Sequence, residues 1–119
     1  MRFLFDTNIV LLHMATGFLN QAWAEHDFFV SVITEAELLR YPGIGAYETN
    51  LIDSFLSITT IIEINSTIAR RAALIGRTRK IKLPDLLIAA TALELDAILI
   101  SKNFKDFRTI PGLHTQTDL

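Results

Sequence analysis

The chain has 119 residues, of which half are hydrophobic and a fifth are charged, so it can bury one substantial core and is not disordered. The formal net charge is -2, there is no cysteine for disulfides or thiolate metal sites, and no apolar run approaches the ~18 residues of a membrane span. We expect one domain over residues 1–119 and a cytoplasmic protein, because Asp6 and Asn8 interrupt the N-terminal apolar stretch, which therefore does not resemble a signal peptide.

Short apolar segments alternate with longer segments along the chain. The short ones are rich in β-branched or aromatic residues and predict buried strands at residues 2–5, 28–32, 59–64 and 97–100. The longer ones predict helices at residues 8–15, 34–39, 46–55, 66–79 and 83–95. Ser66 is the expected N-cap of the helix at residues 66–79, and Ile68, Ala72 and Ile75 form one apolar stripe along it. Parallel strands need crossover connections, so this alternation indicates an α/β sandwich in which helices cover both faces of a mostly parallel sheet.

Asp6 directly follows the first predicted strand, and the sequence turns apolar again at Ile9. Asp is depleted in strands, and burial of a carboxylate without a cation or hydrogen-bond donor nearby is unfavourable by roughly several kcal/mol. An Asp at the end of a strand can also cap the next helix. The position therefore indicates either a functional carboxylate or a helix cap.

Two more acids are predicted at the same edge of the sheet, beyond the carboxyl ends of the strands, where open α/β sheets bind ligands. Glu37 lies one turn into the helix that follows the second strand, and Asp85 lies in the first turn of another helix, just after Pro84. Glu37 could also be a solvated helical residue, and Asp85 could be only a helix-start residue that the dipole favours. The fourth strand delivers Ser101 and Asn103 to this edge.

Carboxylates gathered in this way repel one another, by roughly 4 kcal/mol for a pair about 4 Å apart at an effective dielectric of about 20. A hard divalent cation relieves this repulsion, and oxygen ligands without Cys or His favour Mg²⁺ or Mn²⁺ over zinc. Such ions orient a water, lower its pKa and neutralise charge on a phosphodiester. The predicted cluster is therefore typical of a metal-dependent nuclease.

Positive charge is concentrated in one part of the chain. Residues 64–84 hold six basic residues and no acidic one, whereas the remainder holds five basic and thirteen acidic residues. This segment is either a cationic strip for a polyanion or a solvated helix face. The candidate contacts to an RNA backbone are Arg70, Arg77, Arg79, Lys80 and Lys82.

Four stretches, FDTNIV, VITEAELL, KLPDLLIAATAL and LISKNFKDFRTIPGL, resemble the PIN domain family in order and approximate spacing, and most resemble VapC-type toxin ribonucleases. The resemblance spans nearly the whole chain. It implies a three-layer α/β/α sandwich and a Mg²⁺- or Mn²⁺-dependent endoribonuclease, in which a metal-activated water attacks phosphorus and leaves a 5′-phosphate and a 3′-hydroxyl. It also implies a homodimer and a small antitoxin protein that blocks the site.

The resemblance extends to single residues. The positions that match the family's acidic metal ligands are Asp6, Glu37 and Asp85. Asn103 stands where the family often has Asp, and because an amide contributes no charge, a second metal site is in doubt unless Asp106 partly substitutes. The polar residues that match positions around the pocket are Thr7, Asn8 and Ser101, the last in place of a more usual Thr.

Two alternatives to a nuclease remain open at this point. A haloacid dehalogenase-type phosphatase also has an Asp after its first strand and binds Mg²⁺, but it has a second Asp two residues later, where this chain has Asn8. A PIN-like module that binds RNA or protein without cutting is compatible with the amide at Asn103. Uptake of Mg²⁺ or Mn²⁺ separates the nuclease from the non-catalytic module.

Overall fold

The computed structural model describes residues 1–17 and 25–119. Five parallel strands form one sheet in the order β3-β2-β1-β4-β5. They are β1 (Arg2–Phe5), β2 (Asp27–Ser31), β3 (Thr60–Ile62), β4 (Ile98–Ile100) and β5 (Thr115–Gln116). The strand β1 lies at the centre, so the residue that follows it is flanked by the ends of β2 and β4.

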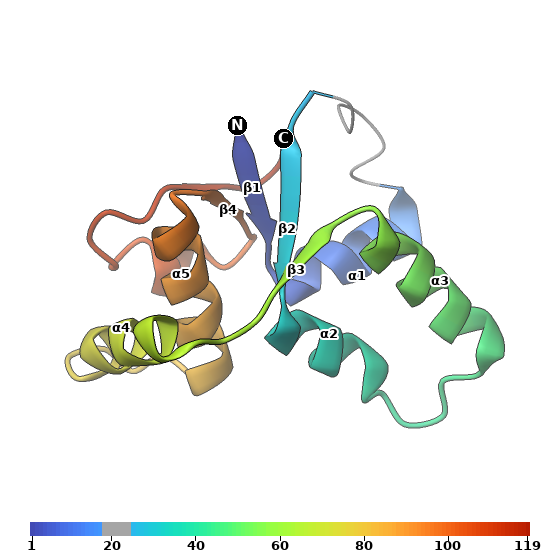
Figure 1. Ribbon diagram of the computed structural model, residues 1–119, viewed down its shortest axis with the longest axis horizontal. Coiled ribbons are helices and arrows are strands. Elements are labelled where there is room, and N and C mark those ends of the chain that lie inside the picture. The colour runs from blue at the N-terminus through green and yellow to red at the C-terminus, as the bar shows by residue number, and fades with distance from the viewer. Residues whose placement is uncertain (18–24) are drawn as a thin grey trace.

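Helices cover both faces of this sheet (Figure 1). They are α1 (Thr7–Thr16), α2 (Val32–Leu39), α3 (Ala46–Ser57), α4 (Ser66–Gly76), α5 (Leu83–Leu95) and the short α6 (Phe104–Phe107). Figure 1 shows α4 and α5 on one side of the strands and α1 and α3 on the other. The predicted three-layer α/β/α sandwich with a parallel sheet is confirmed.

The core divides into two clusters because alternate residues of each strand face opposite sides of the sheet. In β1, Phe3 and Phe5 pack towards α1 and α3, and both rings stack on Phe28 of β2 at centroid distances of 5.9 and 5.3 Å. Leu4 faces the other way and packs in the cluster that contains Ala72 of α4. Burial on both faces fixes the register of β1 and thereby the position of Asp6.

The second strand lies one residue earlier than predicted, at Asp27–Ser31 instead of 28–32. It ends at Ser31, whose hydroxyl accepts a hydrogen bond from the Ile33 N–H at 3.0 Å, so α2 begins at Val32 and not at Thr34. Ser is a better helix cap than any of the apolar residues around it, and this preference ends the strand.

The helix predicted at residues 66–79 begins at the predicted residue, but it has a different cap and ends three residues earlier. Its cap is Asn65, whose Oδ1 accepts from the Ile68 N–H at 2.9 Å, whereas Ser66 had been the expected cap. It ends at Gly76, where an added Cβ would lie 2.8 Å from Leu86 Cδ1, so glycine permits close packing of α4 on α5. The buried stripe Ile68, Ala72 and Ile75 is as predicted.

The helix α6 and the strand β5 are the shortest elements of the fold. The sequence did not predict α6 or β5, which are only four and two residues long and show too few periods to be recognised. Within the described ranges, no helix has the length and apolar character needed to cross a membrane.

Candidate active site at the carboxyl edge of the sheet

Asp6 links β1, α1 and β4. It is 5% exposed, and both carboxylate oxygens accept hydrogen bonds: Oδ1 from the Asn8 N–H at 2.8 Å and Oδ2 from the Ser101 hydroxyl at 2.6 Å. Its own N–H donates to the Ile100 carbonyl at 3.1 Å. The helix-cap interpretation of Asp6 is therefore confirmed, and its second oxygen faces Ser101, just beyond the end of β4, while a functional role for this carboxylate stays a prediction.

Ser101 holds the loop after β4 against Asp6. Its side chain is 1% exposed, donates to Asp6 and accepts a hydrogen bond from the Asn103 N–H at 2.9 Å. One hydroxyl thus orients a carboxylate and fixes the backbone of the loop that carries Asn103. Asn8, by contrast, contributes its backbone N–H, and its side chain is exposed.

A chain of hydroxyl groups positions Glu37. The Thr7 hydroxyl donates to Glu37 Oε1 at 2.7 Å and lies 2.9 Å from the Thr34 hydroxyl. Because Thr7 has a single hydroxyl proton and Glu37 takes it, Thr34 donates to Thr7. Sequence reasoning missed Thr34, although its spacing of three residues from Glu37 places both on one face of α2.

The pKa of Asp85 is affected by the charged side chains around it. This residue is half-buried in the first turn of α5, and its pKa is raised, first by burial and then by the negative charges of Asp6, Glu37 and Asp106, while Lys82 acts in the opposite direction. The three predicted acids are thus close enough to affect one another. Their common location at the carboxyl edge of the sheet is what the sequence predicted.

The fourth acid in this group is Asp106, on α6. Its Oδ2 accepts a hydrogen bond from the Asn103 Nδ2 at 3.2 Å, and its charge contributes to the raised pKa of Asp85. The amide of Asn103 therefore orients a carboxylate three residues later. This geometry fits the expectation that Asp106 supplies the charge that Asn103 lacks.

The side-chain oxygens of the four acids are of the type that binds a hard divalent cation, but they lie too far apart to bind one ion together. Over the described part of the chain, no three acidic or histidine side chains are close enough together to hold one ion. The donor set is nevertheless made of side-chain oxygens, as Mg²⁺ and Mn²⁺ prefer, and mutual repulsion favours wide spacing of the four carboxylates. Ligation requires these carboxylates to draw closer together.

The sequence matches the PIN domain family over residues 3–113. The chain belongs to this family. A search of curated proteins found no match. Membership in the PIN family confirms the resemblance seen in the four sequence stretches and leaves no support for the haloacid dehalogenase alternative.

Solved structures similar to this PIN domain come from toxin–antitoxin complexes. A chain of VapBC-1 from nontypeable Haemophilus influenzae is 28% identical with a TM-score of 0.82, and the match covers 98% of this chain and 97% of that one. A chain of a toxin–antitoxin complex from Klebsiella pneumoniae is 34% identical with a TM-score of 0.72, covering 92% and 93%. VapBC2 from Rickettsia felis, bound to a promoter DNA fragment, shares the fold at 24% identity, with a TM-score of 0.83 and 98% of both chains covered.

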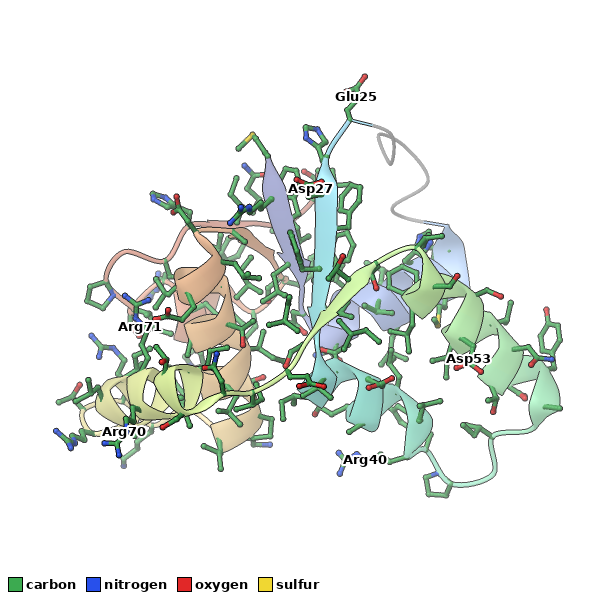
Figure 2. The ribbon with its side chains drawn as sticks, in the orientation of Figure 1. Glu25, Asp27, Arg40, Asp53, Arg70 and Arg71 are labelled. Carbon is green, nitrogen blue, oxygen red and sulfur yellow. The ribbon has the colours of Figure 1, made fainter. Side chains whose placement is uncertain are left out.

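The basic segment of this PIN domain begins on α4 and continues beyond the end of that helix. Arg70 and Arg71 lie on α4 (Figure 2), and Arg71 forms an ion pair with Glu94 at 2.8 Å. Arg79 and Lys80 instead lie beyond the end of α4 and line a pocket next to Asp106. The predicted RNA contacts are thus divided between two locations.

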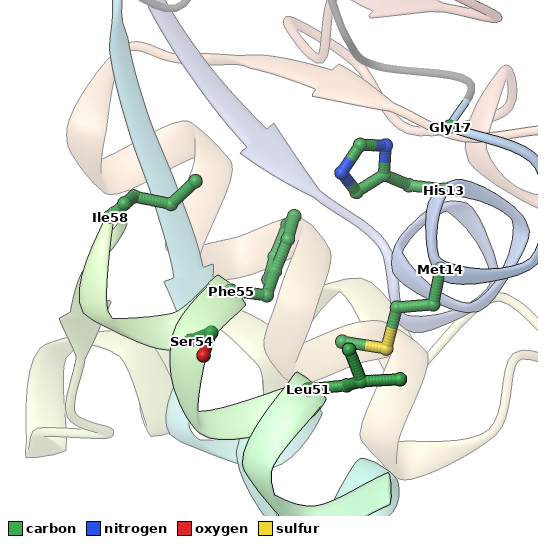
Figure 3. Close-up of a pocket in the computed structure, with 7 residues that line it drawn as sticks. All are labelled: His13, Met14, Gly17, Leu51, Ser54, Phe55 and Ile58. Carbon is green, nitrogen blue, oxygen red and sulfur yellow. The ribbon is translucent and has the colours of Figure 1, made fainter. Parts of the chain in front are cut away.

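A further pocket, of about 350 Å³, lies between α1 and α3 (Figure 3). Its lining includes His13, Met14, Leu51, Phe55 and Ile58 and none of the four acids. The ring of His13 lies 5.4 Å from that of Phe55, and burial lowers the pKa of His13. This pocket of the PIN domain is therefore mostly apolar and separate from the carboxylates.

Proposed function

We propose that this PIN domain is a Mg²⁺- or Mn²⁺-dependent endoribonuclease. The observation that carries the proposal is the convergence of Asp6, Glu37, Asp85 and Asp106 on one edge of the sheet, where three of these charges act on Asp85. Oxygen donors at the carboxyl ends of parallel strands suit a hard cation and a phosphodiester. Family membership supports the same activity.

Each carboxylate has a distinct part in this proposal. Asp6 and Asp85 would be the principal ligands of the cation, with Glu37 and Asp106 completing the set or positioning water. When bound, the cation would supply activation of water and neutralise charge on the phosphodiester. The chain itself orients the ligands, because Ser101 fixes Asp6 and Thr7 fixes Glu37 through the hydrogen bonds described above.

The decisive experiment is incubation of the purified protein with total RNA and Mn²⁺, with and without a chelator, followed by mapping of the cut ends. We expect cleavage that requires the metal and leaves 5′-phosphates and 3′-hydroxyls. Asp6→Asn and Asp85→Asn should each abolish cleavage while the protein stays folded. Undiminished cleavage by both variants would refute this assignment.

We also propose that the chain is the toxin of a toxin–antitoxin pair and forms a homodimer. The similar structures from Haemophilus influenzae and Klebsiella pneumoniae are complexes of this kind, and this supports an antitoxin partner. Expression of the wild-type chain should arrest growth of a bacterial host, and expression of Asp6→Asn should not. Equal growth with both would contradict a toxin, and a monomer mass by light scattering would contradict the dimer.

A non-catalytic PIN-like module remains the second candidate, because Asn103 stands in place of an acid and the carboxylates are not within ligation distance of a common point. Isothermal titration with Mn²⁺ separates the two. Heat of binding that disappears in Asp85→Asn supports the nuclease, whereas no heat beside retained RNA binding supports the module.

A further inference from the structure

A pocket of about 500 Å³ lies where the loop between α4 and α5 meets α6. Its lining consists of Thr78, Arg79, Lys80, Ile81, Lys105, Asp106 and Thr109. Three side chains of this lining are cations and one is an acid. Lys105 was not among the basic residues that the sequence singled out, because it lies outside the segment 64–84.

The guanidinium of Arg79 is held in place within this pocket. Its Nε donates to the Thr109 carbonyl at 3.0 Å, and one terminal nitrogen donates to the Thr78 hydroxyl at 3.1 Å. These bonds use two of the five N–H groups of arginine, so three donors are left for a ligand. A guanidinium fixed by backbone and hydroxyl groups is a preorganised receptor for an anion.

The two lysines of the pocket differ from Arg71 in their ion pairing. Within the described ranges, neither Lys80 nor Lys105 takes part in an ion pair, whereas Arg71 on α4 is paired with Glu94. The pocket therefore concentrates positive charge in a chain whose net charge is -2. Such a concave cationic surface raises the local concentration of anions.

Asp106 joins this pocket to the acidic edge of the sheet. It lines the pocket, accepts a hydrogen bond from Asn103, and acts through its charge on Asp85. An RNA strand that approaches the four acids meets like charge, and this repulsion needs compensation beyond the bound cation. A neighbouring phosphate of the same strand would reach the pocket next.

We infer that the pocket formed by Arg79, Lys80 and Lys105 binds a backbone phosphate of the RNA that flanks the cleaved bond. This inference rests on the proposed ribonuclease function and adds a defined anchor for its substrate. Tetrahedral phosphate suits the combination of a fixed guanidinium with two ammonium groups, because lysine carries its ammonium on a flexible stem. The inference also assigns the contact with the RNA strand to Arg79 and Lys80 and not to Arg70.

The first test uses inorganic phosphate as the probe and needs no nuclease activity. In a titration followed by NMR, the backbone amides of residues 78–81 and 105–109 should shift. Lys80→Gln and Lys105→Gln should each weaken the fitted affinity by about tenfold, as expected for loss of a charge-assisted contact. Arg40→Gln removes the same charge from the end of α2, outside the pocket (Figure 2), and should leave the affinity unchanged.

The second test measures binding of a short single-stranded RNA to the Asp6→Asn protein in the presence of chelator. Each lysine variant should reduce the slope of log affinity against log salt by about 0.7, the value for one lost phosphate contact in single strands, whereas Arg40→Gln should not. An unchanged slope, or absence of shifts at the pocket, would overturn the inference.

The outcomes separate this inference from the proposed function. Phosphate shifts at the pocket in a protein that never cleaves RNA would refute the nuclease and keep an anion site. Metal-dependent cleavage with lysine variants that behave like Arg40→Gln would keep the nuclease and refute the phosphate site. Shifts caused by an aspartate-rich peptide but not by phosphate would identify the pocket as a protein contact and overturn the inference.

Discussion

Asp6 is almost fully buried, yet both of its oxygens have hydrogen-bond donors, and this explains how a carboxylate can follow an apolar strand. The donors come from the next helix and from Ser101, just after β4 and 95 positions later; the sequence placed Ser101 at the same edge of the sheet, but it did not reveal the hydrogen bond to Asp6. Glu37 and Thr34 show the same limit, because Thr7 joins them from another element.

Replacement of Asp85 by Asn tests the repulsion among the acids. The pKa of Asp85 is raised, so the folded protein disfavours the ionised form of this side chain. The protonated side chain therefore contributes stability at pH values below the ordinary pKa of Asp, and this contribution is lost as the pH rises through the raised pKa. In chelator at pH 7, Asp85→Asn should therefore increase the free energy of unfolding by up to about 1 kcal/mol, since solvent screens a half-exposed group. Urea denaturation measures this difference.

The control for this variant is the same measurement below the ordinary pKa of Asp, where the wild-type side chain is also neutral. There the two proteins should unfold at nearly equal denaturant concentrations. A gain in stability that is as large in acid as at pH 7 would mean that packing, rather than charge, distinguishes the variant.

Ser101→Ala tests the support of Asp6. The substitution removes the donor to Asp6 Oδ2 and the acceptor of the Asn103 N–H from a site that is 1% exposed, so we expect a loss of roughly 1.5–3 kcal/mol and slower RNA cleavage. Ser57→Ala on the exposed side of α3 is a matched control and should change stability by less than about 0.5 kcal/mol. Equal effects in both variants would remove Ser101 from its proposed role.

The bounds of helices and strands were predictable where apolar residues dominate the segment. Strand β1 and helix α5 match their predicted bounds, because apolar residues fill most of their length. Helix ends were less predictable, since neighbouring Ser and Asn residues compete to be the cap and only the path of the chain decides between them. The short α6, which carries Asp106, gave no periodic signal at all.

The start of α4 permits a direct test of this competition. Asn65→Ala should reduce the free energy of unfolding by about 1 kcal/mol, because it removes the acceptor of the Ile68 N–H. Ser66→Ala should be nearly neutral, since Ser66 is the first helical residue and is exposed. Chemical denaturation of the two variants gives the comparison, and the reverse order would favour the cap expected from the sequence alone.

The fold of the whole molecule brings four acids from separate segments of the chain to one edge of the sheet. A ligand that binds the folded protein at these acids, and not the unfolded chain, must increase the free energy of unfolding. At a Mn²⁺ concentration about 100 times its Kd, the gain is about 2.7 kcal/mol. We expect Mn²⁺ to raise the Tm of the wild-type protein, measured by differential scanning fluorimetry. Asp6→Asn should lose most of this rise, and an equal rise in the variant would place the ion elsewhere.

The hydrogen bond between Ser101 and Asp6 joins two residues that lie 95 positions apart in the sequence. During synthesis, Asp6 leaves the ribosome long before its partner has been translated. A prematurely terminated product that stops before β4 therefore lacks both the central sheet contact and the hydroxyl that orients this carboxylate. The active site proposed for this protein can therefore assemble only after β4 and Ser101 have been translated, and we expect fragments that stop earlier not to cleave RNA.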